Sequence, residues 1–403
     1  MTNTGAHKVK AIINATILCP VNGLIKNGTI LFNTKIKEVG KDITVPSGTK
    51  TIDAEGKYVV PGMIDAHTHQ GLFDGSIGWA GMDGNEMTNP VTAEVRGIDS
   101  FNPDEPSLKE VLQGGVTTIN TGPGSGNVIS GEALIVKPIG AAIVDDMIVK
   151  APSGLKVAFG ENPKRVHGTE KRTPSTRMGI ASVLRKSLVD AQNHKRELQI
   201  YLEKAEEAKK KGEAQPTPPK RDLGLETIIK VLNKEIPIHA HAHRADDIAT
   251  VIRIAKEFDI DVVLIHCTEG HKIAKVIAKS GFPAVIGPTM FWTSKPETRD
   301  RGFKTAVELN TAGVKVALQT DSLTPMNYFP LLPMNVIKEG MTKEDAFKCV
   351  TINPAEILGI ADRVGSLEPG KDADIVIWSG DPFDFYSKVE QVFIEGKNVP
   401  LKK

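Results

Sequence analysis

The sequence predicts an α/β fold, a (β/α)8 TIM-like barrel with a small β-sandwich domain built from the N- and C-terminal segments. Three observations lead to this prediction. The middle of the chain alternates apolar, β-rich runs with helical patterns, which is typical of parallel strands joined by helices. There are eight such runs, a number that favours a closed barrel. Both chain ends contain short β-rich runs separated by turn residues, which favours a separate small β domain.

The composition limits the kinds of partner. The chain has 403 residues, enough for a barrel and a companion domain. Its 50 Lys and Arg residues nearly balance its 49 Asp and Glu residues, so no overall charge attracts nucleic acid or a membrane surface. We therefore expect a small-molecule substrate, with neither nucleic acid nor membrane as partner. The sequence leaves open whether the chain forms a homo-oligomer.

The cysteines and the N-terminus indicate a cellular compartment. The three cysteines are far apart and form no CxxC pair, which favours a reducing environment. The N-terminal residues lack the apolar core of a signal peptide, and no apolar run is long enough to span a membrane. The predicted location is cytoplasmic.

The domain boundaries follow from the two β-rich ends. Residues 1–57 and 362–403 are predicted to form the composite β-sandwich domain, and residues 58–361 the barrel. Within the barrel, residues 70–106 are rich in Gly and Asp and are expected to form a loop over the barrel mouth. The predicted barrel strands cover residues 59–64, 117–120, 133–137, 156–159, 236–241, 261–266, 284–286 and 315–318.

Helical patterns lie between several of these strands. A long charged pattern covers residues 180–211 and is followed by a Pro-rich segment, residues 215–220, that should act as a stiff linker. The other predicted helices cover residues 107–113, 225–232, 245–258, 273–280 and 299–312. The third strand is the most ambiguous part of this assignment.

The histidines are concentrated where the predicted strands end. Seven of the ten lie in three short patches. Side chains two residues apart in a strand point to the same face, so His67 and His69 can reach one point in space. Barrel enzymes place their chemistry at the C-terminal ends of the strands, so the patches are expected to meet around a divalent metal. The patches are His67 and His69; His239, His241 and His243; and His266 and His271.

Several motifs together resemble the amidohydrolase superfamily, in the branch of imidazolonepropionase-like and prolidase-like enzymes. Residues 61–69 read Pro-Gly-Met-Ile-Asp-Ala-His-Thr-His, His266 follows an apolar strand, and Thr320 and Asp321 follow the last strand. Near the C-terminus come Asn-Pro-Ala at 353–355 and Gly-Lys-Asp-Ala-Asp at 370–374. The resemblance covers nearly the whole chain and implies a metal-bearing barrel with a sandwich from both termini.

The resemblance also implies roles for individual residues. His67 and His69 would bind the more buried metal, and Asp321 would bind it too and act as the general base. His241 and His266 would bind a second metal, if there is one. His241 is preferred over its two neighbours on the strand. His239 should lie deeper in the barrel, and His243 could touch the substrate or hold Asp321.

The fourth strand departs from the commonest pattern of that superfamily. Many members with two metals use a carbamylated lysine as the bridging ligand. Here Glu161 stands at the predicted strand end, with Lys156 at its start, and Glu161 is therefore predicted to be the bridge. If Glu161 is only a surface acid, a single metal is expected. Zinc is the favoured metal, one or two per chain, with manganese or iron as alternatives.

Three basic residues are candidates for binding a substrate carboxylate, together with His243. Arg177 and Arg244 have the better geometry for this, because a guanidinium can bind a carboxylate through two N–H groups. Lys137 ends the third predicted strand, and the alternative is a lysine paired inside the barrel. Residues 290–292, Met-Phe-Trp, follow the seventh strand and either line an apolar pocket or pack in the core.

The predicted function is a metal-dependent hydrolase of carbon–nitrogen bonds in an amide or a cyclic amide. A metal would activate water, and Asp321 would accept its proton. The alternative is an Xaa-Pro-type dipeptidase or a ring deaminase on the same metal site. A non-catalytic scaffold barrel is disfavoured because the ligand set of the resemblance is complete.

Overall fold

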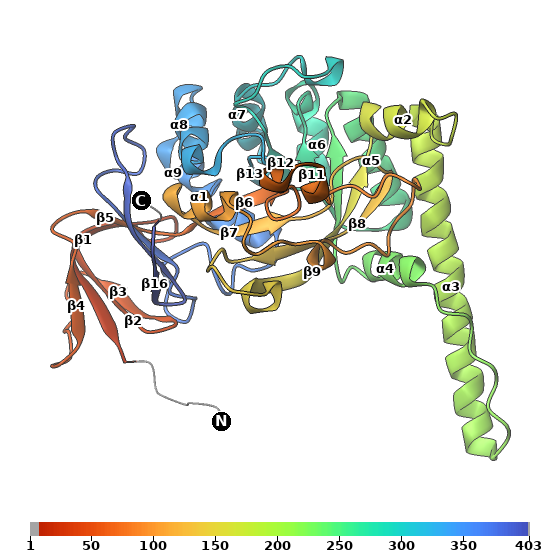
Figure 1. Ribbon diagram of the computed structural model, residues 1–403, viewed down its shortest axis with the longest axis horizontal. Coiled ribbons are helices and arrows are strands. Elements are labelled where there is room, and N and C mark those ends of the chain that lie inside the picture. The colour runs from red at the N-terminus through yellow and green to blue at the C-terminus, as the bar shows by residue number, and fades with distance from the viewer. Residues whose placement is uncertain (1–7, 402–403) are drawn as a thin grey trace.

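The computed structural model describes residues 8–401 of the chain. Two sheets and a surrounding layer of helices make up the fold (Figure 1). Strands β6 to β13 form the barrel sheet: Met63–Thr68, Val116–Thr121, Ile129–Val136, Ile148–Ala158, Ile238–Ala242, Val262–His266, Ala284–Ile286 and Val316–Leu318. Helices α1 to α10 are Ser107–Gln113, Glu161–Gly168, Arg177–Lys211, Leu223–Leu232, Ala245–Phe258, Ala274–Ser280, Lys304–Thr311, Leu331–Lys338, Lys343–Lys348 and Ile352–Ile357.

The two ends of the chain build the second sheet together. Its strand order is β16-β15-β14-β5-β1-β2-β3, and β4 pairs with β1. A separate apolar cluster lies on it and includes Ile12, Phe32, Leu367 and Phe393. Both ends therefore share one small core. Their strands are joined in one sheet, and the β-sandwich stays a prediction. Strands β1 to β5 are Lys10–Cys19, Gly23–Phe32, Ile36–Gly40, Lys50–Asp53 and Tyr58–Pro61, and β14 to β16 are Ile375–Trp378, Val389–Ile394 and Lys397–Val399.

The chain passes from one sheet to the other at Gly62. The sequence predicts one strand over residues 59–64, but the structure divides it into β5 in the terminal sheet and β6 in the barrel. A Cβ atom at Gly62 would overlap the side chain of Thr117, so only glycine fits this close approach. The terminal sheet thus extends past the predicted boundary at residue 57.

The barrel sheet differs from the predicted all-parallel arrangement at one strand. Strand β8 runs antiparallel to both β7 and β9, whereas the other paired strands of this sheet are parallel. Parallel neighbours need a crossover of a dozen or more residues, usually a helix. Only residues 122–128 connect β7 to β8, which is too few. The prediction of eight parallel strands is therefore wrong at β8.

The first and last strands of the barrel meet at their C-terminal ends. The Asp321 N–H donates to the His67 carbonyl at 3.2 Å. Lower down, the carbonyls of Cys349 and Val350 lie between the two strands and accept from Leu318 and Ile64 at 3.0 and 2.8 Å. The eight-stranded sheet is thereby nearly closed, and its first and last strand ends lie side by side.

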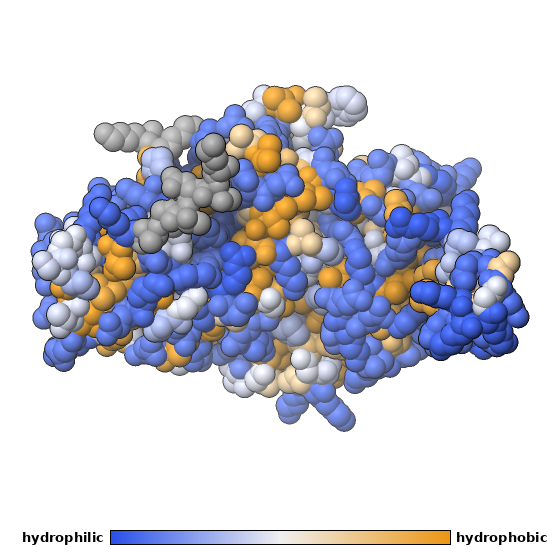
Figure 2. Space-filling view, turned by 90° about the horizontal axis from the view of Figure 1, so that it is seen from below, coloured by the Kyte–Doolittle hydropathy of each residue, from blue (hydrophilic) through white to orange (hydrophobic). Residues whose placement is uncertain are grey.

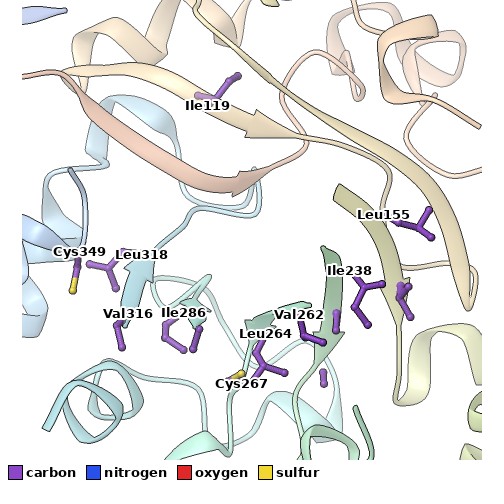
Figure 3. Packing of buried hydrophobic residues seen from close by; sticks show 14 of the residues in the cluster. Ile119, Leu155, Ile238, Val262, Leu264, Cys267, Ile286, Val316, Leu318 and Cys349 are labelled. Atoms are coloured by element: carbon purple, nitrogen blue, oxygen red, sulfur yellow. The ribbon is translucent and has the colours of Figure 1, made fainter. Parts of the chain in front are cut away.

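Alternation along the strands separates the packed layer from the barrel interior. Figure 3 shows Ile238, Leu264, Ile286 and Leu318 on successive strands, and these side chains belong to the large core shared with the helices. The residues between them on the same strands include Val263, Ile265, Val285 and Ala317, which form a small separate cluster. By the same alternation His239 and His241 point inward, away from Ile238.

Helix α3 extends away from the barrel (Figure 1). The Thr176 side chain caps its start by accepting from the Gly179 N–H, and Gly212 ends it in the left-handed conformation. The helix agrees with the pattern predicted over residues 180–211. In the described part of the chain, no helix has both the length and the apolar character to cross a membrane. Hydrophilic residues cover most of the face in Figure 2, with apolar residues grouped near its middle.

Candidate metal centre

Two histidines and one carboxylate meet at the ends of β6 and β13. The Nε2 atoms of His67 and His69 lie 3.4 and 3.3 Å from Asp321 Oδ1. The pairing of β6 with β7 shifts register between Asp65 and Thr68, so His67 lies in a bulge, a feature that often re-aims a side chain. The prediction that both imidazoles reach one point agrees with this geometry.

Three more histidines complete the cluster from β10 and β11. The ring centroid of His266 lies 4.4 Å from that of His241 and 4.7 Å from that of His243. His266 is also 5.7 Å from His67, so it joins the two halves of the cluster. Two groups of residues have ligand atoms close enough to share an ion: His241, His243 and His266; and His67, His266 and Asp321.

Strand-end backbone conformation turns two of these side chains into the mouth. His266 and Asp321 have φ angles of 73° and 54°, in the left-handed region that non-glycine residues rarely adopt. Val262 and Leu264, which share the parity of His266, pack outward. Strict alternation would point the His266 side chain outward too. Its positive φ angle instead turns the side chain toward His241. Such strain is found mainly at functional sites.

Hydrogen bonds to Nδ1 fix how two of the histidines present their other nitrogen. The Nδ1 atoms of His69 and His266 lie 2.7 and 2.6 Å from the carbonyl oxygens of Gly122 and Gly287. A carbonyl only accepts, so each Nδ1 carries the proton and each Nε2 keeps its lone pair. Metal-binding histidines are usually oriented in this way.

The protonation states also suit a metal. Burial holds the pKa of His67 and His241 well below the ordinary value and lowers that of His266 to about 3. Burial opposes ionisation of Asp321, but His266, His67 and His69 outweigh it and hold its pKa well below the ordinary range. The buried Nε2 of His241 has no hydrogen-bond partner within residues 8–401. Neutral imidazoles, one ionised carboxylate and an unpaired buried nitrogen fit a divalent cation.

Lys156 enters the cluster although the sequence interpretation did not select it. Its Nζ lies 2.9 Å from His67 Nε2, and the side chain is buried. Burial lowers the pKa of Lys156 to about 8. Alternation along β9 could have found it, because Leu155 and Val157 pack outward and leave Lys156 facing the interior. A charged side chain is costly to bury unless it has a polar partner, and for Lys156 this partner is His67 of the cluster.

Glu161, the predicted bridge, lies outside the cluster. Strand β9 ends at Ala158, and Gly160 turns the chain with a φ of 86°. Glu161 therefore begins α2, and its backbone N–H donates to Glu297 Oε2 at 3.0 Å. Its side chain lines a neighbouring, highly charged cavity instead of the one above the histidines.

The predicted carboxylate-binding residues are also placed elsewhere, apart from His243. Lys137 is buried far down the barrel, where it contacts Asp372 and two further carboxylates of the terminal sheet. Arg177 binds Asp247 at 3.0 Å, and Arg244 is an exposed partner of its neighbour Asp246 at 2.7 Å. For Lys137 the alternative reading, a paired barrel lysine, is the one the structure shows.

A cavity of about 450 Å³ opens above the cluster. The predicted mouth loop, residues 70–106, contributes Phe73 and Asn85, and the connection between β7 and β8 contributes Gly124 and Ser125. This volume suits a small molecule. The remaining lining residues are His69, Asn162, His241, His243, Ser294, Lys295, Arg301, Asp321, Ser322 and Leu323.

Comparison with known proteins identifies the family. The model of the amidohydrolase family matches residues 140–399, more than half of the chain. The chain belongs to the amidohydrolase family. An imidazolonepropionase from Porphyromonas gingivalis is 26% identical, and the alignment covers 92% of this chain and 86% of the relative. This amidohydrolase is therefore a hydrolase of carbon–nitrogen bonds, and its imidazolonepropionase relatives agree with the predicted imidazolonepropionase-like branch.

Other relatives support the assignment over the whole chain. The crystal structure of an amidohydrolase from Thermotoga maritima MSB8 has 43% identity and a TM-score of 0.90, covering 97% of this chain and all of the other. The amidohydrolase tasK of Hapsidospora irregularis is 28% identical over 93% of this chain, which spans only 39% of that protein's length. A prolidase structure with 18% identity and a TM-score of 0.61 shares the fold.

Proposed function

We propose that this amidohydrolase depends on a divalent metal and hydrolyses an amide or a cyclic amide, with Asp321 as the general base. One observation carries the proposal. The Nε2 atoms of His67 and His69 meet at the partly buried, ionised carboxylate of Asp321, within the reach of a shared ion. Such a set of ligands is typical of catalytic metal sites.

The proposed ligands follow the two halves of the cluster. His67, His69 and Asp321 would hold one metal, and His241 and His266 a second. His243 belongs to the same group of close ligand atoms and is an alternative to His241. Because nitrogen ligands predominate, zinc is the favoured metal, with manganese or iron as alternatives.

We assign the bridging position to Lys156 and no longer to Glu161. The amine of Lys156 would add to the carbon of carbon dioxide and lose a proton, which gives a carbamate with two oxygens. Its Nζ already lies 2.9 Å from His67 Nε2, whereas Glu161 lines another cavity. The lowered pKa of Lys156, caused by burial, increases the fraction of the free amine that this reaction needs.

The chain's own groups then account for the proton transfers. When bound, the metal would lower the pKa of water and polarise the scissile carbonyl. Asp321 would accept a proton from the attacking water and pass it to the leaving nitrogen, so that the amine departs neutral. Asp65 supports this position, because its carboxylate accepts from the Thr320 hydroxyl at 2.5 Å, next to Asp321.

Three finer points stay predictions. An Xaa-Pro-type dipeptidase or a ring deaminase would use the same ligands and differ only in the walls of the cavity. The cytoplasmic location and the assembly of a homo-oligomer are the other two points. A scaffold without catalysis is disfavoured, because the chain belongs to a hydrolase family and keeps a full set of ligand residues.

A hydrolysis screen tests the proposal. The purified chain would be stripped of metal with a chelator and assayed with N-acyl amino acids, dipeptides and cyclic ureides, with and without added zinc or manganese. We expect hydrolysis of at least one class that disappears on chelation and returns with metal. Turnover that survives complete removal of metal would contradict the proposal.

A further inference from the structure

One cation in the mouth cavity stands out because it forms no ion pair in the part of the chain that the structure describes. Arg301 lines the cavity together with His69, His241 and Asp321. It lies between the short helical turn Pro296–Thr298 and helix α7. Its position was not predicted, because no strand end or motif marks it in the sequence.

Two contacts hold the Arg301 guanidinium in place. Its Nη1 donates to the carbonyl of Trp292 at 2.8 Å. Its central carbon lies 5.6 Å from the ring centroid of Phe291, in the range of a cation–π contact. The sequence left open whether residues 290–292 line a pocket or pack in the core. Here Phe291 and Trp292 instead support the arginine.

No ion pair involving Arg301 is found within residues 8–401. By contrast, Arg177 and Arg244 each have a carboxylate partner at 3.0 and 2.7 Å. Arg301 is also about half buried, and this burial lowers its pKa despite the nearby charge of Asp321. A partly buried cation without a counter-charge is unfavourable, so a ligand that supplies one would bind well.

The other cation of the cavity is already neutralised. The Nζ of Lys295 lies 2.7 Å from Glu297 Oε1 and 3.0 Å from Asn162 Oδ1. The opposite charges of Lys295 and Glu297 cancel, so this pair contributes no net charge to the cavity. Arg301 is therefore the residue that gives this wall of the cavity its positive charge.

An apolar surface completes the cavity. Phe73 and Leu323 line it, and the ring centroid of Phe73 lies 5.6 Å from that of His69. A ligand that fills this space thus meets an apolar wall, a guanidinium and the metal ligands. The cavity, at about 450 Å³, leaves room for a small molecule only.

From this arrangement we propose that Arg301 binds a carboxylate of the substrate, which makes the substrate class small N-acyl amino acids with an apolar side chain. The inference rests on the proposed function. A carboxylate carries one negative charge and matches the fork of one guanidinium. A phosphate group carries nearly two charges and would leave part of its charge unpaired beside a single free cation.

The test uses a matched pair of compounds that differ only in this charge. N-acetyl-L-leucine carries the carboxylate, and N-acetyl-L-leucinamide replaces it with a neutral amide. With metal restored, we expect the wild-type enzyme to have a kcat/KM roughly 10- to 100-fold higher for the acid. Arg301→Gln should remove this preference, and Arg301→Lys should keep part of it. Circular dichroism would confirm that both variants are folded.

The neighbouring arginine gives the control. The side chain of Arg299 is 72% exposed and lines the adjacent charged cavity. Arg299→Gln removes a positive charge two residues away and should keep the full preference for the acid. An equal loss in this variant would show that general charge, not Arg301, causes the effect and would overturn the proposal.

A binding measurement separates this inference from the proposed function. Calorimetric titration of Asp321→Asn with both compounds reports recognition without turnover. Binding of the acid alone, lost when Arg301→Gln is added, supports the inference even if no compound is hydrolysed. Binding of neither compound, or equal binding of both, overturns it. Tighter binding of phenyl phosphate than of the acid would also overturn it, in favour of a phosphate ligand.

Discussion

Two buried lysines, one at each end of the barrel, have opposite surroundings. Lys137 lies where the barrel meets the terminal sheet, and its Nζ contacts Asp372, Asp374 and Glu395 at 2.6, 3.0 and 3.1 Å. Lys156 lies near the mouth, where its Nζ contacts the His67 imidazole at 2.9 Å and no carboxylate forms an ion pair with it in residues 8–401. Both residues are 2% exposed, so burial does not distinguish them.

The two sites differ in the number of ion-pair partners that the buried lysine has. The lower site is an ion-pair network that joins the barrel to the terminal sheet, and Lys35 and Arg363 pair with its carboxylates as well. The upper site has an unpaired His241 nitrogen, a lysine beside an imidazole and an arginine without a counter-ion. Buried polar groups are normally paired, so unpaired ones indicate where another molecule or ion binds.

The largest effect is expected at Asp321. Replacing it by Asn keeps the size of the side chain but removes the proton acceptor. We expect kcat to fall by roughly 10²- to 10⁴-fold, the usual contribution of a general base. Steady-state kinetics on a substrate from the screen would measure this, and metal analysis would show whether the ion is retained. Asp190→Asn, on the exposed face of α3, is the matched control and should keep full activity.

Full activity of Asp321→Asn would exclude this residue as the base. Loss of both activity and metal would leave Asp321 as a ligand, without evidence for proton transfer. The two readouts therefore separate its two proposed roles.

The second prediction compares Lys156 with Glu161. Lys156→Ala should lower the metal content of the chain and reduce activity by about 100-fold, because a metal ligand is lost. Glu161→Ala should change neither, since Glu161 lies in the adjacent cavity. Elemental analysis of both purified variants gives the metal content. The opposite outcome, metal lost only in Glu161→Ala, would restore Glu161 as the bridging residue.

This pair also shows what could be predicted from the sequence. The histidines follow from strand periodicity and strand ends, two local features that the chain encodes directly. His67, His69, His241 and His266 do converge, and Asp321 lies with them. The choice of Glu161 relied on the end of the fourth strand alone, and Gly160 turns that end away.

Other parts depend on contacts that no local pattern records. Arg301 enters the cavity because a loop folds over the mouth, and Lys137 finds its partners more than two hundred residues later in the chain. The antiparallel β8 depends on a connection too short for a helix, a clue that the strand count did not use. The barrel, the chain-end sheet and the histidine cluster could be predicted, but the position of Arg301 on the cavity wall could not.

The third prediction tests the ion-pair network. Lys137→Met should lower the free energy of unfolding by about 3–5 kcal/mol, because the buried Asp374 carboxylate loses its one ion-pair partner in residues 8–401. Urea denaturation followed by circular dichroism would measure the loss. Lys186→Met removes a surface lysine that pairs with Asp190 and should change stability by less than about 0.5 kcal/mol. Equal effects of the two substitutions would mean that the network contributes little.

The smallest expected effect is the pH dependence of that loss. Burial alone would lower the pKa of Lys137, but Asp374 and Asp372 outweigh it and hold the pKa above the ordinary value of 10.5. A raised pKa in the folded state means that the stabilisation is complete below the unfolded value and is lost as the pH rises through the folded one. The stability difference between wild type and Lys137→Met should therefore be constant from about pH 8 to 10 and shrink as the pH rises above about 10.5.

Denaturation curves at several alkaline pH values would measure this trend, with Lys186→Met as the reference for general alkaline loss of stability. A difference that stays constant above about pH 11 would mean that the charge of Lys137 does not stabilise the fold. In that case the close contacts with Asp372 and Asp374 would contribute only packing. Charge pairing would then not explain the difference between the two ends of the barrel.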